Sequence, residues 1–154
     1  LSTNAELDNK TVWLTGGGSG IGRCLALSLS RQGHRVVISG RDRQRLEAVV
    51  AEAKDTRILS KVVDVTDNAI LARVVAEIEA EAGPIAMAFL NAGDYSPMGL
   101  DAFDAELFRR LIEINYMGVV NCLQALLPLM LARQNGQILI SASLSGYRGL
   151  PVNW

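Results

Sequence analysis

Residues 11–33 read TVWLTGGGSGIGRCLALSLSRQG, an apolar run followed by a cluster of glycines and then an amphipathic stretch. The run 11–15 has the composition of a buried strand, and the apolar spacing over 20–32 is that of a helix. Glycines in a strand-to-helix turn let the backbone pass close to a bulky anion, and the free N–H groups at a helix start attract negative charge. This stretch therefore predicts a βα unit whose turn can hold a pyrophosphate.

The glycines of the turn have the spacing Gly16-x-x-x-Gly20-x-Gly22. This spacing differs from the GxGxxG fingerprint of dinucleotide-binding folds, because Arg23 stands where a third small residue is expected. A glycine-rich turn is also compatible with a tight connection that binds nothing. Its position after the first strand of a repeated strand-helix series favours the phosphate-binding interpretation.

The rest of the chain alternates short apolar runs with longer amphipathic stretches. After the first unit come VVIS and a helix over 43–54, ILSKVV and a helix over 67–82, IAMAFL and a helix over 103–133, and finally QILIS. Runs that are apolar throughout are typical of parallel strands covered by helices on both faces. Thr66 is expected to cap the third helix, and Gly33 and Gly83 to end the first and third. The predicted fold class is α/β, a doubly wound parallel sheet (Rossmann fold) with five strands present.

Length and composition indicate a globular protein. The chain has 154 residues, 49% hydrophobic and 20% charged, with Lys+Arg 15 against Asp+Glu 16. This balance excludes a polybasic arm, so no nucleic-acid partner is expected. No uninterrupted apolar stretch approaches the ~20 residues that cross a bilayer, and LSTNAELDNK lacks the pattern of a signal peptide, so no membrane partner is expected. Cys24 and Cys122 form no CxxC or Cys/His cluster, so no metal site is expected and the thiols fit a cytoplasmic protein.

Several motifs resemble those of the short-chain dehydrogenases/reductases, classical type. TGGGSGIG at 15–22 resembles the family's TGxxxGIG cofactor motif, and Asn91-Ala92-Gly93 resembles its NNAG motif, with Leu90 replacing the first asparagine. Asp64 in VVDVTD resembles the aspartate that contacts the adenine, Asn115 in EINYMG the helix asparagine, and Ser143 in ISASLSG the catalytic serine. The resemblance implies a cofactor site made of Gly16, Gly18, Ser19, Gly20, Ile21, Gly22, Arg41, Asp64, Val65, Asn91, Ala92 and Gly93, and catalytic roles for Ser143 and Asn115.

Each landmark also has an interpretation that requires no ligand. Residues 91–93 could form a strand-ending turn, and Asp64 could be an ordinary cap near Thr66. Asn115 could be a polar residue on a long helix, and Ser143 one hydroxyl among the three serines at 141–145. The common register of the landmarks favours the functional interpretation. His34, the only histidine, is expected to be a surface turn residue rather than a general base.

The residues after the second strand bear on which nicotinamide dinucleotide is used. A carboxylate there accepts a hydrogen bond from the ribose 2′-hydroxyl of NAD, whereas an arginine pairs with the 2′-phosphate of NADP. Gly40 stands where NAD-preferring members of the resembled family carry aspartate, and Arg41 matches the basic residue of NADP-preferring members. Arg43 and Arg45 add positive charge to a helix start, which favours a bound anion. The expected cofactor is NADP(H), with Asp42 as a ribose ligand for NAD the alternative.

In the resembled family a tyrosine exchanges a proton with the substrate oxygen, a lysine lowers the pKa of that tyrosine, and a serine hydrogen-bonds the same oxygen. Ser143 would be that serine, and Asn115 would continue a proton path to the lysine. The Tyr-x-x-x-Lys pair is absent, and family spacing places its start within a few residues of Trp154. We therefore expect a single domain over 1–154 that lacks its C-terminal portion.

Two readings remain open from the sequence. The first is an NADP(H)-dependent oxidoreductase that interconverts an alcohol and a ketone or aldehyde by hydride transfer, with a small-molecule substrate and a homo-oligomeric assembly. The second is a non-catalytic dinucleotide-binding or sensing module that lacks the Tyr-x-x-x-Lys pair. The register of Ser143 and Asn115 favours the enzyme, because a binding module has no evident need of both.

Overall fold

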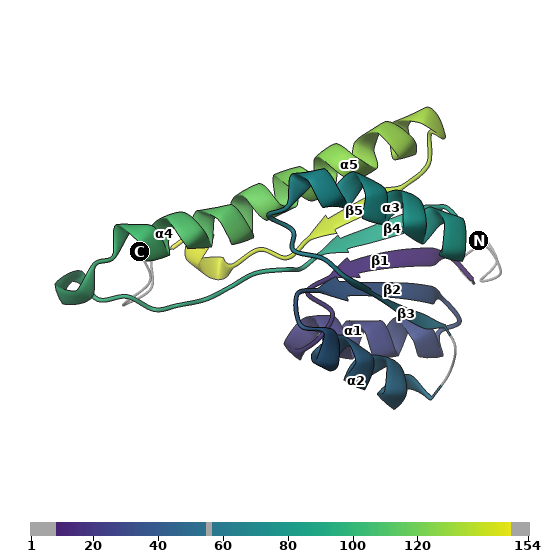
Figure 1. Ribbon diagram of the computed structural model, residues 1–154, viewed down its shortest axis with the longest axis horizontal. Coiled ribbons are helices and arrows are strands. Elements are labelled where there is room, and N and C mark those ends of the chain that lie inside the picture. The colour runs from purple at the N-terminus through teal and green to yellow at the C-terminus, as the bar shows by residue number, and fades with distance from the viewer. Residues whose placement is uncertain (1–8, 55–56, 149–154) are drawn as a thin grey trace.

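The computed structural model describes residues 9–54 and 57–148 and contains a five-stranded parallel sheet (Figure 1). The strand order is β3-β2-β1-β4-β5, so the chain begins in the middle of the sheet, proceeds to one edge and then crosses to the other. This order is that of a Rossmann fold and confirms the predicted fold class. The elements are β1 Thr11–Thr15, α1 Gly20–Arg31, β2 Arg35–Gly40, α2 Arg43–Ala53, β3 Ile58–Val62, α3 Asn68–Ala82, β4 Ile85–Leu90, α4 Ala105–Ile112, α5 Gly118–Ala132 and β5 Gln137–Ile140, with short helical turns at Leu100–Ala102, Glu113–Met117 and Leu144–Gly146.

Helices cover the two faces of the sheet in pairs. Figure 1 shows α1 and α2 on one side and α3 and α5 on the other. Because side chains alternate along a strand, Val36 and Ile38 pack with α1 and α2, whereas Val37 and Trp13 belong to the core under α3 and α5. The edge strands are covered less than their apolar sequences predict, since both ends of β5 are exposed. The core is therefore centred on β1, β2 and β4.

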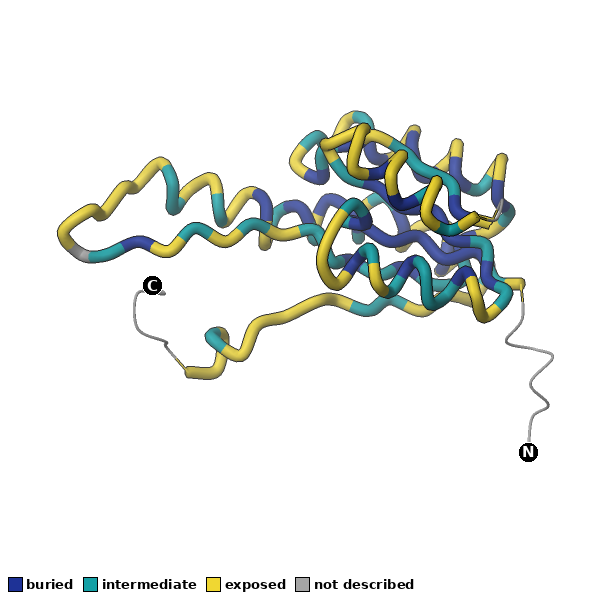
Figure 2. Tube along the Cα trace, turned by 90° about the horizontal axis from the view of Figure 1, so that it is seen from below, coloured by how far each residue is buried: buried dark blue, intermediate teal, exposed yellow. Residues whose placement is uncertain are grey.

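The single helix predicted over 103–133 is divided in the structure. A π-helical turn at Glu113–Met117 separates α4 from α5, and α4 begins after Asp104, whose side chain accepts hydrogen bonds from two N–H groups of the first turn. None of the residues of α4 is buried. Figures 1 and 2 show that α4 and the segment leading to it extend beyond the sheet as an arm.

The helical stretch Ala105–Ala132 is long and apolar enough, by length and composition, to cross a membrane, and an 18-residue window within it has a mean hydropathy of 1.5. A search for uninterrupted apolar runs does not find it, because polar residues such as Asn121 interrupt the stretch. Within the fold, Cys122, Leu126 and Met130 of α5 belong to the core shared with α3. A core helix passes the same test, so this property alone is weak evidence for a membrane segment.

The ends of two helices confirm the glycine predictions and correct the cap. Gly33 and Gly83, with φ of 95° and 86°, follow α1 and α3 as expected. The cap of α3 is Asp67, not Thr66, because the Asp67 carboxylate accepts a hydrogen bond from the helix. Thr66 instead donates its hydroxyl to Asp64 at 2.9 Å. The hydroxyl of Thr66 therefore shapes the loop after β3.

The expectation that His34 is a surface residue is wrong. Its exposed fraction is 9%, and within the described residues its Nδ1 atom has no hydrogen-bond partner. The residue lies between α1 and β2, far along the sheet from the strand ends where ligands bind. His34 is therefore a core residue of the turn that precedes β2.

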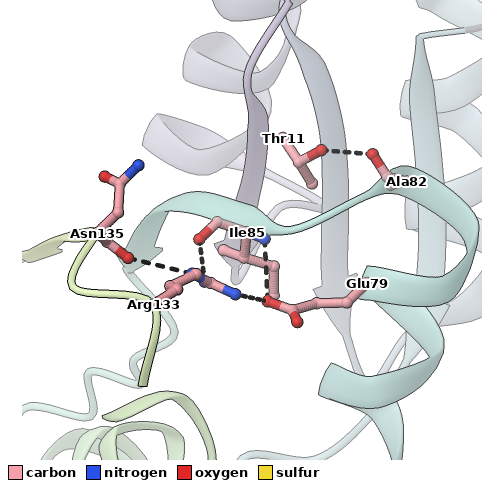
Figure 3. Close-up of polar contacts among 6 residues, drawn as sticks. All are labelled: Thr11, Glu79, Ala82, Ile85, Arg133 and Asn135. Carbon is pink, nitrogen blue, oxygen red and sulfur yellow. Dashed lines mark hydrogen bonds and ion pairs between the residues drawn. The ribbon is translucent and has the colours of Figure 1, made fainter. Parts of the chain in front are cut away.

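A polar network fastens the amino-terminal edge of the sheet (Figure 3). Arg133, just after α5, donates hydrogen bonds to the Glu79 carboxylate at 2.6 Å and to the carbonyl oxygens of Ile85 and Asn135 at 2.5 and 3.1 Å. Glu79 also accepts from the Ile85 N–H at 3.0 Å. One guanidinium thus connects the ends of α3 and α5 with the start of β4.

Candidate functional site

The carboxyl-terminal ends of the strands meet at one edge of the sheet, where the loops enclose a cleft. Doubly wound sheets bind their ligands at this edge. The predicted cofactor residues that line the cleft are Gly16, Gly18, Ser19, Arg41, Asp64, Val65, Ala92 and Gly93. Residues outside the predicted cofactor site also line it, namely Gly40, Asp42, Arg45, Leu46, Val63 and Ile114. The structure thus brings five segments, distant in sequence, to one place.

The N-terminus of α1 differs from those of α2, α3 and α4. Asp42, Asp67 and Asp104 cap α2, α3 and α4 by accepting backbone N–H groups through their carboxylates. Ser19, at the same position of α1, makes no side-chain hydrogen bond to the helix, and the first turn of α1 has no acidic residue. Because Ser19 lines the cleft, the free N–H groups and the positive end of the helix dipole open onto it. This arrangement fits an anion such as a pyrophosphate.

The glycines of the turn have different purposes. Gly16 has φ of +69°, and a Cβ atom there would lie 2.9 Å from the Cα atom of Ala92. Gly22 is buried, and its Cβ atom would lie 2.2 Å from the Gly16 carbonyl oxygen. Gly22 therefore supplies the close packing of helix on turn that the GxGxxG comparison placed at Arg23. Gly20, with φ of +51° and open space around it, allows the chain to enter the helix.

Thr15 and Asn91 lock the ends of β1 and β4 together. The Thr15 hydroxyl, on a residue 1% exposed, accepts hydrogen bonds from the N–H groups of Asn91 at 2.9 Å and Ala92 at 3.0 Å. The Asn91 side chain donates to the Thr15 carbonyl at 3.4 Å and accepts from the Ser141 hydroxyl at 2.9 Å. Asn91 thus holds together the turns after β1, β4 and β5, so its side chain positions the cleft.

The loop after β3 is supported from α5. Asn121, a buried polar residue, donates its Nδ2 to the Val65 carbonyl at 3.0 Å. Gly118 is buried under the same residue, and a Cβ atom there would lie 2.6 Å from Val65 Cγ2. Asp64 accepts from the N–H of Thr66 at 3.0 Å. These contacts fix Asp64 and Val65 at the wall of the cleft.

Three arginines follow β2 and have different surroundings. Arg41 lies 3.9 Å from Asp64, and its side chain is 62% exposed. Arg45 lies 3.2 Å from Asp42, whereas Arg43 lies 3.8 Å from Glu47, one turn further along α2. Arg41 and Arg45 line the cleft; Arg43 is not among the lining residues. The positive charge at this helix start is therefore divided between the cleft and the outer surface.

Asn115 lies in the π-helical turn between α4 and α5. Its side chain accepts from the Asp94 N–H at 2.7 Å and donates to the Asp94 carbonyl at 2.9 Å. A Cβ atom at Gly93 would lie 3.1 Å from Asn115 Oδ1, a contact closer than most, so a larger residue here would press on the Asn115 side chain. Asn115 therefore holds the segment after β4 by two hydrogen bonds. π-helical turns occur frequently at functional sites.

Ser143 follows β5 and caps the short helical turn at Leu144–Gly146. Its hydroxyl lies 2.7 Å from the hydroxyl of Ser145 and accepts from the Ser145 N–H at 3.2 Å. The residue is exposed and is not among those that line the cleft. The positions near Trp154, where the family tyrosine is expected, lie outside the described residues.

Sequence reasoning gave no part in the site to Asn121 or Ser141, although both shape it. It used Thr15 only as part of the TGGGSGIG motif and Arg45 only as positive charge at a helix start. Asn121 carries the clearest signal, because an amide within an otherwise apolar helix is expected to meet a buried polar partner. Asp42 and Arg45 are three residues apart at the start of α2, a spacing at which side chains on a helix meet, so local sequence carries a signal for this pair. The pairing of Thr15 with Asn91 has no such signal, because it depends on how two distant segments meet.

The described fold and cleft agree with the family comparison. Residues 10–153 match the short chain dehydrogenase family, and the chain belongs to this family of oxidoreductases. A protein of Myxococcus xanthus named as an uncharacterized oxidoreductase is 38% identical over 149 residues, covering 95% of this chain and 58% of that protein. Human dehydrogenase/reductase SDR family member 7 is 34% identical over 156 residues, covering 96% and 45%.

Solved structures give the same result. Actinorhodin polyketide ketoreductase with NADPH (F189W variant) has a TM-score of 0.89 and 26% identity, covering 94% of this chain and 57% of that one. Levodione reductase has a TM-score of 0.88 and 31% identity, covering 93% and 57%. The chain thus spans less than two thirds of the length of these relatives.

Proposed function

We propose that this chain binds NADP(H) and belongs to an enzyme that interconverts an alcohol and a ketone or aldehyde by hydride transfer. The observation that carries the proposal is the uncapped N-terminus of α1 opening onto a cleft lined by the TGGGSGIG and NAG segments. Two reductases among the similar structures support carbonyl chemistry, and one of them is described with NADPH. Family membership supports catalysis over a purely binding role.

The residues of the cleft fit a dinucleotide. The backbone of Gly16 to Gly20 and the start of α1 would hold the pyrophosphate, because N–H groups and no carboxylate meet there. Asp64 and Val65 would hold the adenine. The backbone of Ala92 and Gly93 would pass close to the middle of the bound dinucleotide. When bound, the nicotinamide supplies or accepts the hydride.

Ser143 is the proposed hydrogen-bond partner of the substrate oxygen. Its hydroxyl, now paired with that of Ser145 at 2.7 Å, would donate to the substrate and accept from Ser145. Asn115 is proposed to act through the segment after β4, because both of its polar atoms bind Asp94. Its expected part in a proton path remains a proposal.

The preference for NADP(H) is supported by the contacts that the charged residues after β2 already make. Asp42 accepts the Arg45 N–H at 3.1 Å as the cap of α2. Turning it to a ribose would remove that cap, at a cost of about 1 kcal/mol. Among the described residues Arg41 pairs with Asp64 alone, at 3.9 Å, an exposed contact that contributes little. A 2′-phosphate, with more charge than a carboxylate, competes well for Arg41.

Binding measurements test the cofactor preference. NADPH should bind more tightly than NADH, and Arg41→Ala should remove most of the difference, about ten- to a hundredfold in affinity for a charge-assisted pair. Gly40→Asp should shift the preference toward NADH, because the new carboxylate repels the phosphate and accepts the ribose hydroxyl. Equal affinities in the wild type, or equal losses for both cofactors in Arg41→Ala, would show that Arg41 does not bind the phosphate.

We further propose that the protein is a cytoplasmic homo-oligomer. Exposed apolar residues on α4 and α5, among them Ile112 and Leu131 at 47% and 71% exposure, support self-association. Cys24 and Cys122 are free thiols, and burial raises the pKa of Cys122 to about 12, which keeps it unreactive. Free thiols fit a reducing compartment. Sedimentation of the protein at several concentrations measures its assembly.

A further inference from the structure

We propose that Arg45 is a second determinant of cofactor specificity and shares the 2′-phosphate with Arg41. The inference rests on the proposed preference for NADP(H) and names the residue that completes the phosphate site. Arg45 belongs to α2 and lines the same cleft as Arg41, at the end of β2. Family motifs assign it no role, so the proposal depends on its surroundings alone.

The position of Arg45 is fixed by its contact with the glycine turn. A Cβ atom at Gly18 would lie 3.1 Å from Arg45 Cβ, so the base of the arginine side chain stands directly against the turn. Gly40 and Leu46 line the cleft beside it. The Arg45 side chain therefore begins between the proposed pyrophosphate site and the end of β2. The ribose of a bound dinucleotide would lie at that strand end.

Asp42 keeps the Arg45 guanidinium near the cleft without blocking it. One carboxylate oxygen of Asp42 accepts the Arg45 N–H at 3.1 Å, and the other lies 3.2 Å from Arg45 Nε. The guanidinium can therefore leave Asp42 while the cap of α2 remains. The Arg45 side chain is 67% exposed, so the ion pair that must be given up is weak. A phosphate offers bidentate acceptors to a guanidinium.

Arg43 provides a matched control on the same helix. It has the same charge and lies two residues away, but its guanidinium lies 3.8 Å from Glu47 and it is not among the residues that line the cleft. Its side chain is 71% exposed, close to the 67% of Arg45. A general effect of positive charge would therefore appear in variants of both residues, and a direct contact only in variants of Arg45.

The test compares two nucleotides that differ only in the 2′-phosphate, adenosine 2′,5′-bisphosphate and adenosine 5′-monophosphate. Calorimetric titrations would use the wild type, Arg45→Gln and Arg43→Gln. We expect Arg45→Gln to weaken binding of the bisphosphate by about ten- to a hundredfold and that of the monophosphate by less than about twofold. Arg43→Gln should leave both affinities within about twofold of wild type.

Asp42→Asn gives an independent variant, because asparagine also caps helices. Removing this carboxylate should strengthen bisphosphate binding, since the phosphate no longer competes with Asp42 for the guanidinium. In an Arg45→Gln background most of that gain should disappear, because the residue that it released is absent. Thermal unfolding without ligand confirms that each variant is folded, and Arg45→Met replaces Arg45→Gln if that variant is not.

The outcomes separate this inference from the proposed function. Equal losses in Arg45→Gln and Arg43→Gln, or a loss for both nucleotides alike, would overturn a direct contact of Arg45 with the phosphate. If Arg41→Ala reduces the preference and Arg45→Gln does not, the cofactor proposal stands and the inference about Arg45 is wrong. A wild type that binds both nucleotides equally overturns the preference for NADP(H) and the role of Arg45 together.

Discussion

At position 22 there is no space for a side chain, so glycine is the residue that fits. A Cβ atom would lie 2.2 Å from the backbone oxygen of Gly16, which cannot move without opening the turn. Alanine favours the helix by up to about 1 kcal/mol relative to glycine, but overpacking costs about 1–3 kcal/mol, so the clash dominates. We predict that Gly22→Ala lowers the free energy of unfolding, measured by urea denaturation.

Gly146→Ala is the control for this prediction. A Cβ atom at Gly146 would meet nothing within 4 Å, so the substitution should change the free energy of unfolding by less than about 0.5 kcal/mol. If Gly22→Ala unfolds at the same urea concentration as the wild type, then α1 does not pack on the turn as closely as the structure indicates.

Single residues show how far the sequence can be interpreted. Gly16, Asp64 and Ala92, which come from three separate motifs, all line the cleft, and their parts in cofactor binding stay predictions. The motifs did not distinguish a glycine that faces the cleft from one that packs beneath it. At both positions glycine leaves room that a side chain would fill, so the sequence looks the same. The motifs also did not separate Arg43 from Arg45, because the direction of a side chain at a helix start depends on its tertiary contacts.

Among the elements, the strands were predicted well and the long helix was not. The apolar spacing of residues 103–133 continues through the π-helical turn, so periodicity alone gives one helix. The turn is revealed by Asn115, which reaches Asp94 on the segment after β4. That partner is 21 residues away in sequence, and local patterns carry no information about it.

The joint between α3, α5 and β4 depends on Arg133. Its side chain and that of Glu79 are 25% and 20% exposed, and its guanidinium also binds the Ile85 carbonyl. Arg133→Met keeps much of the aliphatic side chain but leaves these acceptors without their charged donor. We predict a loss of about 1–3 kcal/mol in the free energy of unfolding, measured by urea denaturation.

Arg73 offers a matched surface arginine for comparison. It lies 3.6 Å from Glu77 on α3 and is 70% exposed, so Arg73→Met should cost less than about 0.5 kcal/mol. Similar costs for Arg73→Met and Arg133→Met would mean that the network in Figure 3 adds no more than an ordinary surface pair.

For the whole molecule, the order of the elements was enough to predict the sheet. Strands that alternate with helices are joined by crossover connections, and such connections make the joined strands parallel. They are almost always right-handed. The order β3-β2-β1-β4-β5 then places the turn after β1 beside that after β4. The cleft therefore lies at the carboxyl ends of the strands, and the Arg133 network lies at their amino ends.

This division predicts a spatial pattern of protection when NADPH binds. Binding should slow hydrogen exchange in peptides covering 15–22, 63–66 and 91–95, because these segments line or support the cleft and because hydrogen bonds join Thr15 to Asn91 and Ala92. Peptides covering 79–85 should change little, because the Arg133 network holds them at the opposite edge in both states.

The measurement must separate local from global opening. At a ligand concentration of 100 Kd the free energy of unfolding of the whole domain rises by about 2.7 kcal/mol, so exchange that requires global unfolding slows everywhere. The comparison must therefore use amides that exchange by local opening. Exchange measured at short labelling times, with and without NADPH, separates the two processes. Protection of 79–85 equal to that of 15–22 at these times would place the ligand elsewhere or show that the two edges open together.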